Sequence, residues 1–199
     1  MKAFILIFTF CSISILSFAQ SYDNTILQFR QKYEADFLND KHSPLKTSDL
    51  QYLRYYQPDI TYKVPAAFVA TPETKPFSMP THSGKDKMYK EYGILTFRIH
   101  DTLLNLHIYM RIGGQEHEDY LFIPFTDQTT YSETFGGGRY LDITTKDIVN
   151  NRVELDFNKS YNPYCAYADG YSCPIPPREN DLSVFIRAGE KLFGKNQPE

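Results

Sequence analysis

The chain has 199 residues, of which 42% are hydrophobic and 16% aromatic, and its formal net charge at pH 7 is −3. This length and composition suit a single globular domain with a core of its own. A slightly acidic chain without a Lys/Arg cluster lacks the basic footprint of nucleic-acid-binding proteins, so we expect no nucleic-acid partner.

The first residues have the features of a secretory signal peptide. Lys2 precedes an apolar run from Ala3 to Leu16, and Ser17 and Ala19 have the small-residue spacing that signal peptidase recognises. The run is shorter than the about 20 residues that span a bilayer. We therefore predict a signal peptide at 1–19, cleaved after Ala19, and a single domain over 20–199. The exported product would be periplasmic or secreted, with no transmembrane anchor after cleavage.

An amphipathic helix is expected directly after the predicted cleavage site. Within residues 22–39, Ile26, Phe29, Tyr33 and Phe37 recur at the three- and four-residue intervals that place side chains on one helix face. The helix should end before the HSPL motif, because the residue before a proline avoids the helical conformation.

Short strands are expected over most of the remaining chain. Residues 62–69 read as a strand interrupted or edged by Pro65. Apolar and polar residues alternate through 93–100 and again through 103–111, and the short link between these runs indicates an antiparallel hairpin. DYLFIPFTD gives another strand, with Pro124 at an edge or near its end. Further short strands are predicted in RYLDI, RVELDFN and LSVFIRAGEKLF.

One helix and many closely spaced strands indicate a mainly β (or α+β) class. We expect an antiparallel β barrel or sandwich, covered on one side by the N-terminal amphipathic helix.

Standard catalytic signatures are missing from the sequence. It has no Gly-x-Ser-x-Gly elbow and no His-Glu-x-x-His zinc helix, and no Gly-Lys-Ser/Thr follows the glycine run at 136–139. The two late cysteines have neither a nearby histidine nor a second cysteine pair, which argues against a zinc site. We therefore expect no metal and no cofactor.

A first cluster of polar residues surrounds three consecutive glycines. The glycines allow close approach of a backbone or a ligand, so the cluster is either one side of a pocket or a glycine-rich turn with an ordinary salt bridge. In TDQTTYSETFGGGRYLD the candidate residues are Asp127, Glu133, Gly136, Gly137, Gly138, Arg139, Tyr140 and Asp142.

A second cluster lies in LDFNKSYNPYCAYADGYSCPIPPREN. Leu155 and Phe157 should point inward, which would turn Asp156 and Asn158 together to the opposite face. Carboxylate pairs, Asp127 with Glu133 or Asp156 with Glu179, would support acid–base chemistry if the members were buried near each other. The candidate pocket residues of this cluster are Asp156, Asn158, Tyr161, Asn162, Glu179 and Asn180.

Two cysteines remain after removal of the predicted signal peptide. An even pair in an exported chain favours a disulfide between Cys165 and Cys173. Glycine and proline between them allow the tight excursion that such a bond needs.

Several long motifs in the same order resemble the domain of unknown function 1684 family. They are FIPFTDQTTYSETFGGGRYLD, LDFNKSYNPYCAYADGYSCPIPPREN and AGEK, preceded by FRQKYEADF, SPL and YYQPDITYKV. The chain departs from the family pattern at Thr126, Gln128–Thr129 and Tyr131. The matching positions are Asp127, Glu133, Thr134, Gly136, Gly138, Arg139, Tyr140, Asp142, Asp156, Asn158, Asn162, Pro163, Cys165, Cys173, Glu179 and Asn180.

The resemblance implies a shared fold and carries no activity, cofactor or catalytic residue over to this chain. Both cysteines belong to the family pattern even in members that look cytoplasmic, which leaves free thiols as the alternative to a disulfide.

Three functions are compatible with the sequence. The first is binding of a small polar or glycan-like ligand in a Tyr/Arg/carboxylate pocket, because tyrosine rings stack on sugars while their hydroxyls form hydrogen bonds. The second is a hydrolase that uses an Asp/Glu pair with Arg139. The third is a purely structural envelope protein, in which the motifs encode turns and buried hydrogen bonds.

Overall fold

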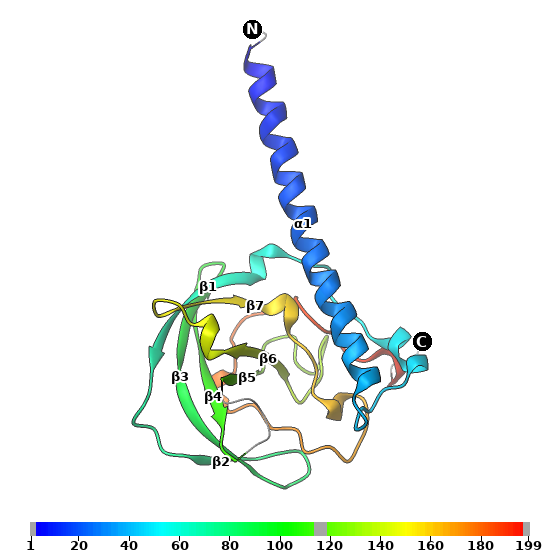
Figure 1. Cartoon of the computed structure of the whole chain (residues 1–199), viewed down its shortest axis with the longest axis vertical. Coiled ribbons are helices and arrows are strands. Elements are labelled where there is room, and N and C mark those ends of the chain that lie inside the picture. The colour runs from blue at the N-terminus through cyan, green and yellow to red at the C-terminus, as the bar shows by residue number, and fades with distance from the viewer. Residues whose placement is uncertain (1–2, 114–118, 197–199) are drawn as a thin grey trace.

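The computed structural model describes residues 3–113 and 119–196. A single long helix, α1 (Ala3–Asn39), opens the chain; its first half extends away from the sheet and its second half packs along the domain (Figure 1). Ile26 and Phe37 of the predicted stripe are buried, and Phe29 and Tyr33 are half-buried, so this face of the helix is confirmed. The predicted signal peptide covers the first half of α1, whose side chains lie outside the described part of the chain.

The described residues form a seven-stranded antiparallel sheet with the order β6-β5-β4-β3-β1-β7 and β2 added beside β3. It curls into a half-barrel that stays open between β6 and β7, and α1 crosses beside that opening (Figure 1). The predicted mainly β class with an N-terminal helix is confirmed. The strands are β1 (Lys63–Ala70), β2 (Phe77–Met79), β3 (Lys87–Ile99), β4 (Thr102–Arg111), β5 (Tyr120–Phe125), β6 (Arg139–Thr144) and β7 (Arg152–Asp156).

The β3–β4 hairpin forms as the alternation of its sequence predicts. Leu95 lies opposite Leu106, and both are fully buried. These side chains belong to the main core inside the half-barrel, to which β1, β5, β6 and β7 contribute alternate apolar residues. A single buried face thus fixes the register, because a shift by one residue would expose every apolar side chain.

Prolines mark where two strands form fewer backbone hydrogen bonds. Pro65 lies within β1 at a point where this strand pairs with β7 and not with β3. Pro124 is the second-last residue of β5, opposite Tyr140 of β6, as predicted for a strand near its end.

The strand predicted for LSVFIRAGEKLF is wrong. Its apolar residues are buried, among them Leu182, Ile186 and Phe193, but the segment forms no regular ladder in the described chain. Its backbone instead bonds irregular neighbours: Glu190 N–H donates to Ser160 O at 2.9 Å and Lys191 N–H to Arg54 O at 2.8 Å. Burial of every few side chains by itself gives this segment the alternation of apolar and polar residues that is typical of a strand.

Short 3-10 helices connect many of these elements, at Thr47–Tyr52, Ile60–Tyr62, Thr145–Asp147, Phe157–Lys159, Tyr164–Ala166, Arg178–Asn180 and Gly194–Asn196. No helix within residues 3–113 and 119–196 combines the length and the apolar character needed to cross a membrane.

A second aromatic cluster lies apart from the main core. Its buried members are Met79, Tyr89, Tyr109, Phe122 and Tyr140, and Tyr120 and Tyr161 pack against it. The loop from 161 to 174 reaches this cluster at both ends. Tyr161 pairs with Tyr140 through two backbone hydrogen bonds, and the Tyr140 hydroxyl donates to the carbonyl oxygen of Pro174.

Candidate functional site

Asp127 and Arg139 form a buried ion pair in the interior. Arg139 Nη2 donates to Asp127 Oδ2 at 2.8 Å, and each side chain is only 1% exposed. The same guanidinium donates to the backbone oxygens of Ile186 and Glu190, at 2.8 and 3.2 Å. The pair therefore holds the irregular C-terminal segment against the sheet. Removing one partner from such a pair typically costs about 3–5 kcal/mol of stability.

Asp156 and Asn158 lie together, as the sequence predicts, at the end of β7. Asp156 Oδ1 accepts hydrogen bonds from the Tyr22 hydroxyl at 2.9 Å and from Asn158 N–H at 3.1 Å. The Asn158 side chain also bonds both backbone groups of Asp59, at 2.8 Å each. These two residues thereby connect α1, the start of β1 and the end of β7.

Asn162 has a buried partner that the sequence did not single out. Its N–H donates to Glu190 Oε2 at 2.9 Å, and the Tyr167 hydroxyl lies 2.7 and 2.8 Å from the two oxygens of Glu190. Glu190 is fully buried, and this burial raises its pKa to about 7 despite these hydrogen bonds. The only sequence signal for Glu190 is its place in AGEK, next to the glycine of a turn.

Glu133, Glu179 and Asn180 have separate surroundings. Glu133 pairs with Arg187 at 2.8 Å and accepts a hydrogen bond from the Tyr56 hydroxyl at 2.9 Å. Glu179 is exposed and accepts a hydrogen bond from the Tyr109 hydroxyl at 3.1 Å. Asn180 is fully buried between β4 and β5. Asp127 and Glu133 thus have different partners, as do Asp156 and Glu179.

Gly138 occupies a conformation that only glycine adopts easily. Its φ is +81°, and a Cβ atom there would lie 2.6 Å from the oxygen of Phe125 and 2.7 Å from Cγ of Pro176. The glycine run therefore forms a close turn that brings Arg139 back under β5. Gly136 and Gly137 belong to the same turn and meet aromatic side chains rather than a cavity.

A tyrosine-lined pocket of about 410 Å³ lies between the sheet and the 161–174 loop. Tyr89, Phe122 and Tyr140 form its buried floor, whereas Tyr161 and Tyr171 are half-buried in its walls. We call this space the tyrosine pocket; its lining residues are Lys87, Tyr89, Tyr120, Phe122, Tyr140, Tyr161, Asn162, Pro163, Tyr164, Tyr171, Ser172, Cys173 and Pro174. Of the residues predicted from the sequence, it brings together Tyr140, Tyr161 and Asn162.

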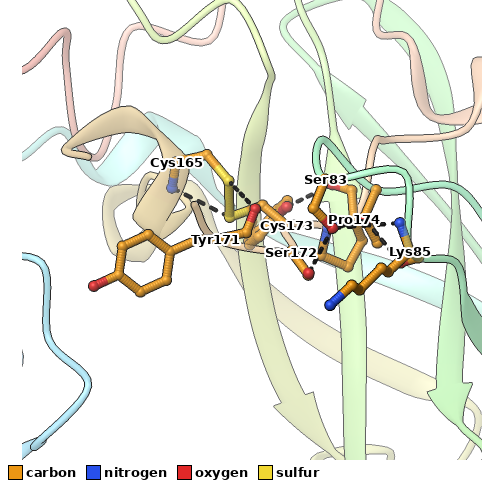
Figure 2. The surroundings of a disulfide bond; sticks show 9 residues. Ser83, Lys85, Cys165, Tyr171, Ser172, Cys173 and Pro174 are labelled. Carbon is orange, nitrogen blue, oxygen red and sulfur yellow. Dashed lines mark hydrogen bonds between the residues drawn. A yellow bond between two sulfur atoms is a disulfide. The ribbon is translucent and has the colours of Figure 1, made fainter. Parts of the chain in front are cut away.

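A disulfide holds one wall of the tyrosine pocket. Cys165 and Cys173 are joined, with their Cα atoms 6.2 Å apart, so the disulfide prediction is supported (Figure 2). The loop that the bond closes carries Tyr171. Beyond the bond, Ser172 Oγ lies 2.6 Å from Ser83 Oγ, and His82 N–H donates to Cys173 O at 3.0 Å, which fastens the wall to the turn before β3 (Figure 2).

Asp142 lies beside the tyrosine pocket and contacts two of its tyrosines. The hydroxyls of Tyr120 and Tyr161 donate to its two oxygens at 2.7 Å each. The residue is open to solvent, but it lies in a concave part of the surface where protein surrounds the carboxylate on most sides. This desolvation raises the pKa of Asp142, and the two hydroxyls act in the opposite direction.

A second cavity, of about 290 Å³, occupies the opening between β6 and β7. We call it the edge cavity; it is lined by Phe29, Leu141, Asp142, Ile143, Asp147, Glu154, Leu155, Asp156, Lys159 and Tyr161. Neither cavity is lined by both members of a predicted carboxylate pair. Within the described residues, no group of three His, Cys, Asp or Glu side chains is placed to hold a metal ion.

Comparison with known proteins identifies the family. The family model described as "Protein of unknown function (DUF1684)" matches residues 48–191, most of the chain. The chain belongs to the DUF1684 family. The matched range includes every strand of the sheet, the tyrosine pocket and all residues that the edge cavity takes from β6 and β7, whereas α1 lies before it. No curated protein matches the chain.

A solved structure shares the DUF1684 fold of this chain. The solution NMR structure of an uncharacterized protein from Haloarcula marismortui is 28% identical in sequence and superposes with a TM-score of 0.63. The alignment covers 85% of this chain and 97% of the archaeal one. The similarity therefore extends over nearly the whole domain and adds no activity.

Proposed function

We propose that this protein is an exported binding domain that holds a small polar, glycan-like ligand in the tyrosine pocket. The observation that carries the proposal is the concentration of tyrosine rings around one open space of about 410 Å³. Ligand pockets of proteins usually measure about 300–1,000 Å³ and combine aromatic walls with a few polar groups.

The arrangement of floor and walls suits a ring-shaped ligand with hydroxyl groups. Buried rings of Tyr89, Phe122 and Tyr140 give a rigid apolar floor, since they also pack on one another, with Phe122 and Tyr140 centroids 4.7 Å apart. Half-buried Tyr161 and Tyr171 line the sides; their hydroxyls donate to Asp142 at 2.7 Å and to the His42 oxygen at 2.8 Å, which leaves each hydroxyl oxygen able to accept a hydrogen bond. Such rings cover the apolar faces of sugars while their hydroxyls reach polar substituents.

Binding is better supported than hydrolysis. None of the described residues that line the tyrosine pocket is a carboxylate or a histidine, so the predicted Asp/Glu pair does not face a ligand there. Arg139, the predicted partner of an Asp/Glu pair in a hydrolase, is buried in the interior and pairs there with Asp127. Its role in the proposal is indirect: as the first residue of β6, it anchors this strand next to Tyr140.

Export is supported by two independent features. The sequence of residues 1–19 has the pattern of a secretory signal peptide. The disulfide between Cys165 and Cys173 is a bond that persists in oxidising compartments such as the periplasm.

A thermal-shift screen of monosaccharides, glycan oligomers and peptidoglycan fragments tests the proposal, followed by calorimetric titration of any hit. Tyr171→Ala should weaken binding about two- to thirteenfold, because one stacked ring contributes about 0.5–1.5 kcal/mol. Tyr171→Phe, which keeps the ring, should bind nearly as wild type does.

Tyr131→Ala is the matched control, since Tyr131 is 84% exposed and does not line the pocket. The proposal fails if none of these compounds raises the unfolding midpoint, or if Tyr171→Ala and Tyr131→Ala bind a hit equally well.

A further inference from the structure

The edge cavity is bounded by backbone as well as by side chains. Three consecutive residues of β6 and three of β7 line it: Leu141, Asp142, Ile143 and Glu154, Leu155, Asp156. Successive side chains of a strand point to opposite faces of the sheet, so three neighbours can border one space only along the strand's edge. The cavity therefore lies between two strand edges that face each other.

On β6, the hydrogen-bonding direction follows from Tyr140. Its N–H and C=O both bond Tyr161, on the side away from β5, and its partner Pro124 on β5 has no N–H to offer. In an antiparallel pair this direction repeats every second residue, so Asp142 also directs its N–H and C=O toward the edge cavity. Among the described residues, these two backbone groups have no hydrogen-bond partner.

On β7, the direction follows from Arg152. Its N–H and C=O bond Val149 on the side away from β1, and Pro65 of β1 lies opposite Glu154. The same alternation turns the backbone groups of Glu154 and Asp156 toward the edge cavity. Within residues 3–113 and 119–196, the N–H groups of both residues and the C=O of Glu154 have no backbone partner, whereas the C=O of Asp156 accepts the first hydrogen bond of the 3-10 helix Phe157–Lys159. The two edges thus present unpaired donors and acceptors to one shared space.

We propose that the edge cavity receives an extended peptide segment of a partner protein, which adds a strand between β6 and β7. Addition of a strand to an exposed sheet edge is a general mode of peptide recognition, in which backbone bonds supply affinity and alternate side chains supply specificity. The segment runs antiparallel to β7 and therefore parallel to β6, because each strand from β6 to β7 is antiparallel to the next. The Tyr140–Tyr161 bridge closes one end of the space and limits how far the segment extends.

The side chains around the cavity specify an alternating peptide. Leu141 and Leu155 belong to the main core and lie on the inner side, where a small apolar residue would fit. On the outer side lie the carboxylates of Asp142, Glu154 and Asp156, with Asp147 beside them. Lys159 is the one basic residue among the lining residues, and Lys63 pairs with Glu154 at 2.8 Å. The excess of negative charge selects lysine or arginine at alternate positions of the peptide.

A labelled peptide, Lys-Val-Lys-Val-Lys, tests the proposal by fluorescence anisotropy with the full chain. A peptide residue opposite Glu154 exchanges both backbone hydrogen bonds with it and shares its outward face, so the lysine amides pair with β7. N-methylation of the central lysine amide should weaken binding about tenfold or more, because it removes a donor and blocks the approach of the strand. The valine amides face β6 in this arrangement, so N-methylation of one of them should also weaken binding.

Protein variants separate this site from general charge attraction. Glu154→Lys should weaken binding by about tenfold, whereas Asp101→Lys, in the exposed turn between β3 and β4, should leave it within about twofold of wild type. Circular dichroism checks that both variants fold. On the wild-type protein, bound peptide should slow amide exchange of Asp142, Glu154 and Asp156, a readout that depends on no substitution.

Three results would overturn the proposal. The first is equal binding of the reordered peptide Lys-Lys-Lys-Val-Val or of the peptide N-methylated at lysine, which would leave only charge attraction. The second is unchanged exchange at Asp142, Glu154 and Asp156 in the presence of saturating peptide. The third is a dimer in light scattering that protects these amides without peptide, because the edge cavity would then belong to a second copy of this chain.

Discussion

Glu190 is a carboxyl group that the fold keeps away from water. It is fully buried, and its hydrogen bonds come from neutral donors, the Tyr167 hydroxyl and the Asn162 N–H, at 2.7–2.9 Å. A buried carboxylate loses its hydration, and here this desolvation outweighs the hydrogen bonds and the attraction of Arg139. The folded protein therefore retains the proton of Glu190 to a higher pH than the unfolded chain does.

This difference predicts the pH dependence of stability. The pKa of Glu190 is 4.5 in the unfolded chain and about 7 in the folded protein. Between these pH values the folded protein therefore binds more protons than the unfolded chain. The contribution of Glu190 is then greatest below pH 4.5, falls as the pH rises toward 7, and levels off above it. The full loss is roughly 3 kcal/mol on the linkage relation. Glu190→Gln should flatten this decline in urea-unfolding measurements and be more stable than wild type at pH 8.

Glu154→Gln is the control for that measurement, because the Glu154 side chain is 68% exposed. Its pH profile should follow wild type. Parallel profiles of Glu190→Gln and wild type would show that Glu190 is not the responsible group.

At the scale of elements, the side chain of Asn180 forms hydrogen bonds with the backbones of both β4 and β5. These two strands share a single paired position, Tyr109 with Phe122. Asn180 Oδ1 accepts from His107 N–H at 2.7 Å, and its Nδ2 donates to the oxygens of His107 and Pro124 at 2.9 and 2.7 Å. Pro124 has no N–H, and the two strands diverge beyond their single paired position. The carboxamide of Asn180 therefore supplies hydrogen bonds that β4 and β5 do not form with each other.

Replacing Asn180 should therefore weaken the sheet. Asn180→Ala leaves one buried and two part-buried backbone groups without this partner, and a buried group left so costs about 1–3 kcal/mol. We expect a loss of at least about 3 kcal/mol in the free energy of unfolding, measured with urea. Asn105→Ala, an exposed asparagine on β4 bonded to Thr96, should lose less than about 1 kcal/mol. Equal losses in the two variants would contradict this role.

The elements also show what sequence patterns could and could not predict. The β3–β4 hairpin was predictable because burial on one face imposes a period of two on neighbouring strands. The segment 182–193 has similar alternation without a ladder, since Arg139 and other non-adjacent groups bond its backbone.

The same limit applies to the candidate site: Asp127 and Arg139 stood out as polar motif residues, yet their burial as a pair depends on contacts distant in sequence. Tyrosines of β3 and β5 that line the tyrosine pocket were not predicted, because packing alone brings them next to the 161–174 loop.

At the scale of the whole molecule, the loop from 161 to 174 joins parts of the domain that the strand order leaves apart. It pairs with β6 through Tyr161 and bonds the turn before β3 through Ser172 and Cys173. It also contacts α1, because the hydroxyls of Tyr33 and Tyr167 lie 3.2 Å apart. The disulfide shortens the free length of this loop. We therefore expect the stability of the domain and the shape of the tyrosine pocket to depend on the same covalent bond.

The variant in which Ser replaces both Cys165 and Cys173 tests this dependence. A bridge across eight positions contributes about 2.5 kcal/mol on the loop-entropy estimate, so the variant should unfold at correspondingly lower urea concentration. Because Tyr171 lies inside the closed loop, any compound found to bind the tyrosine pocket should also bind the variant more weakly, at a temperature where both proteins are folded. Reduction of the wild type with dithiothreitol should reproduce both effects and should not change the variant further. If reduction lowered stability but left the affinity as it was, the loop would keep its shape without the bond, and Ser83 with Ser172 would be enough to position the wall.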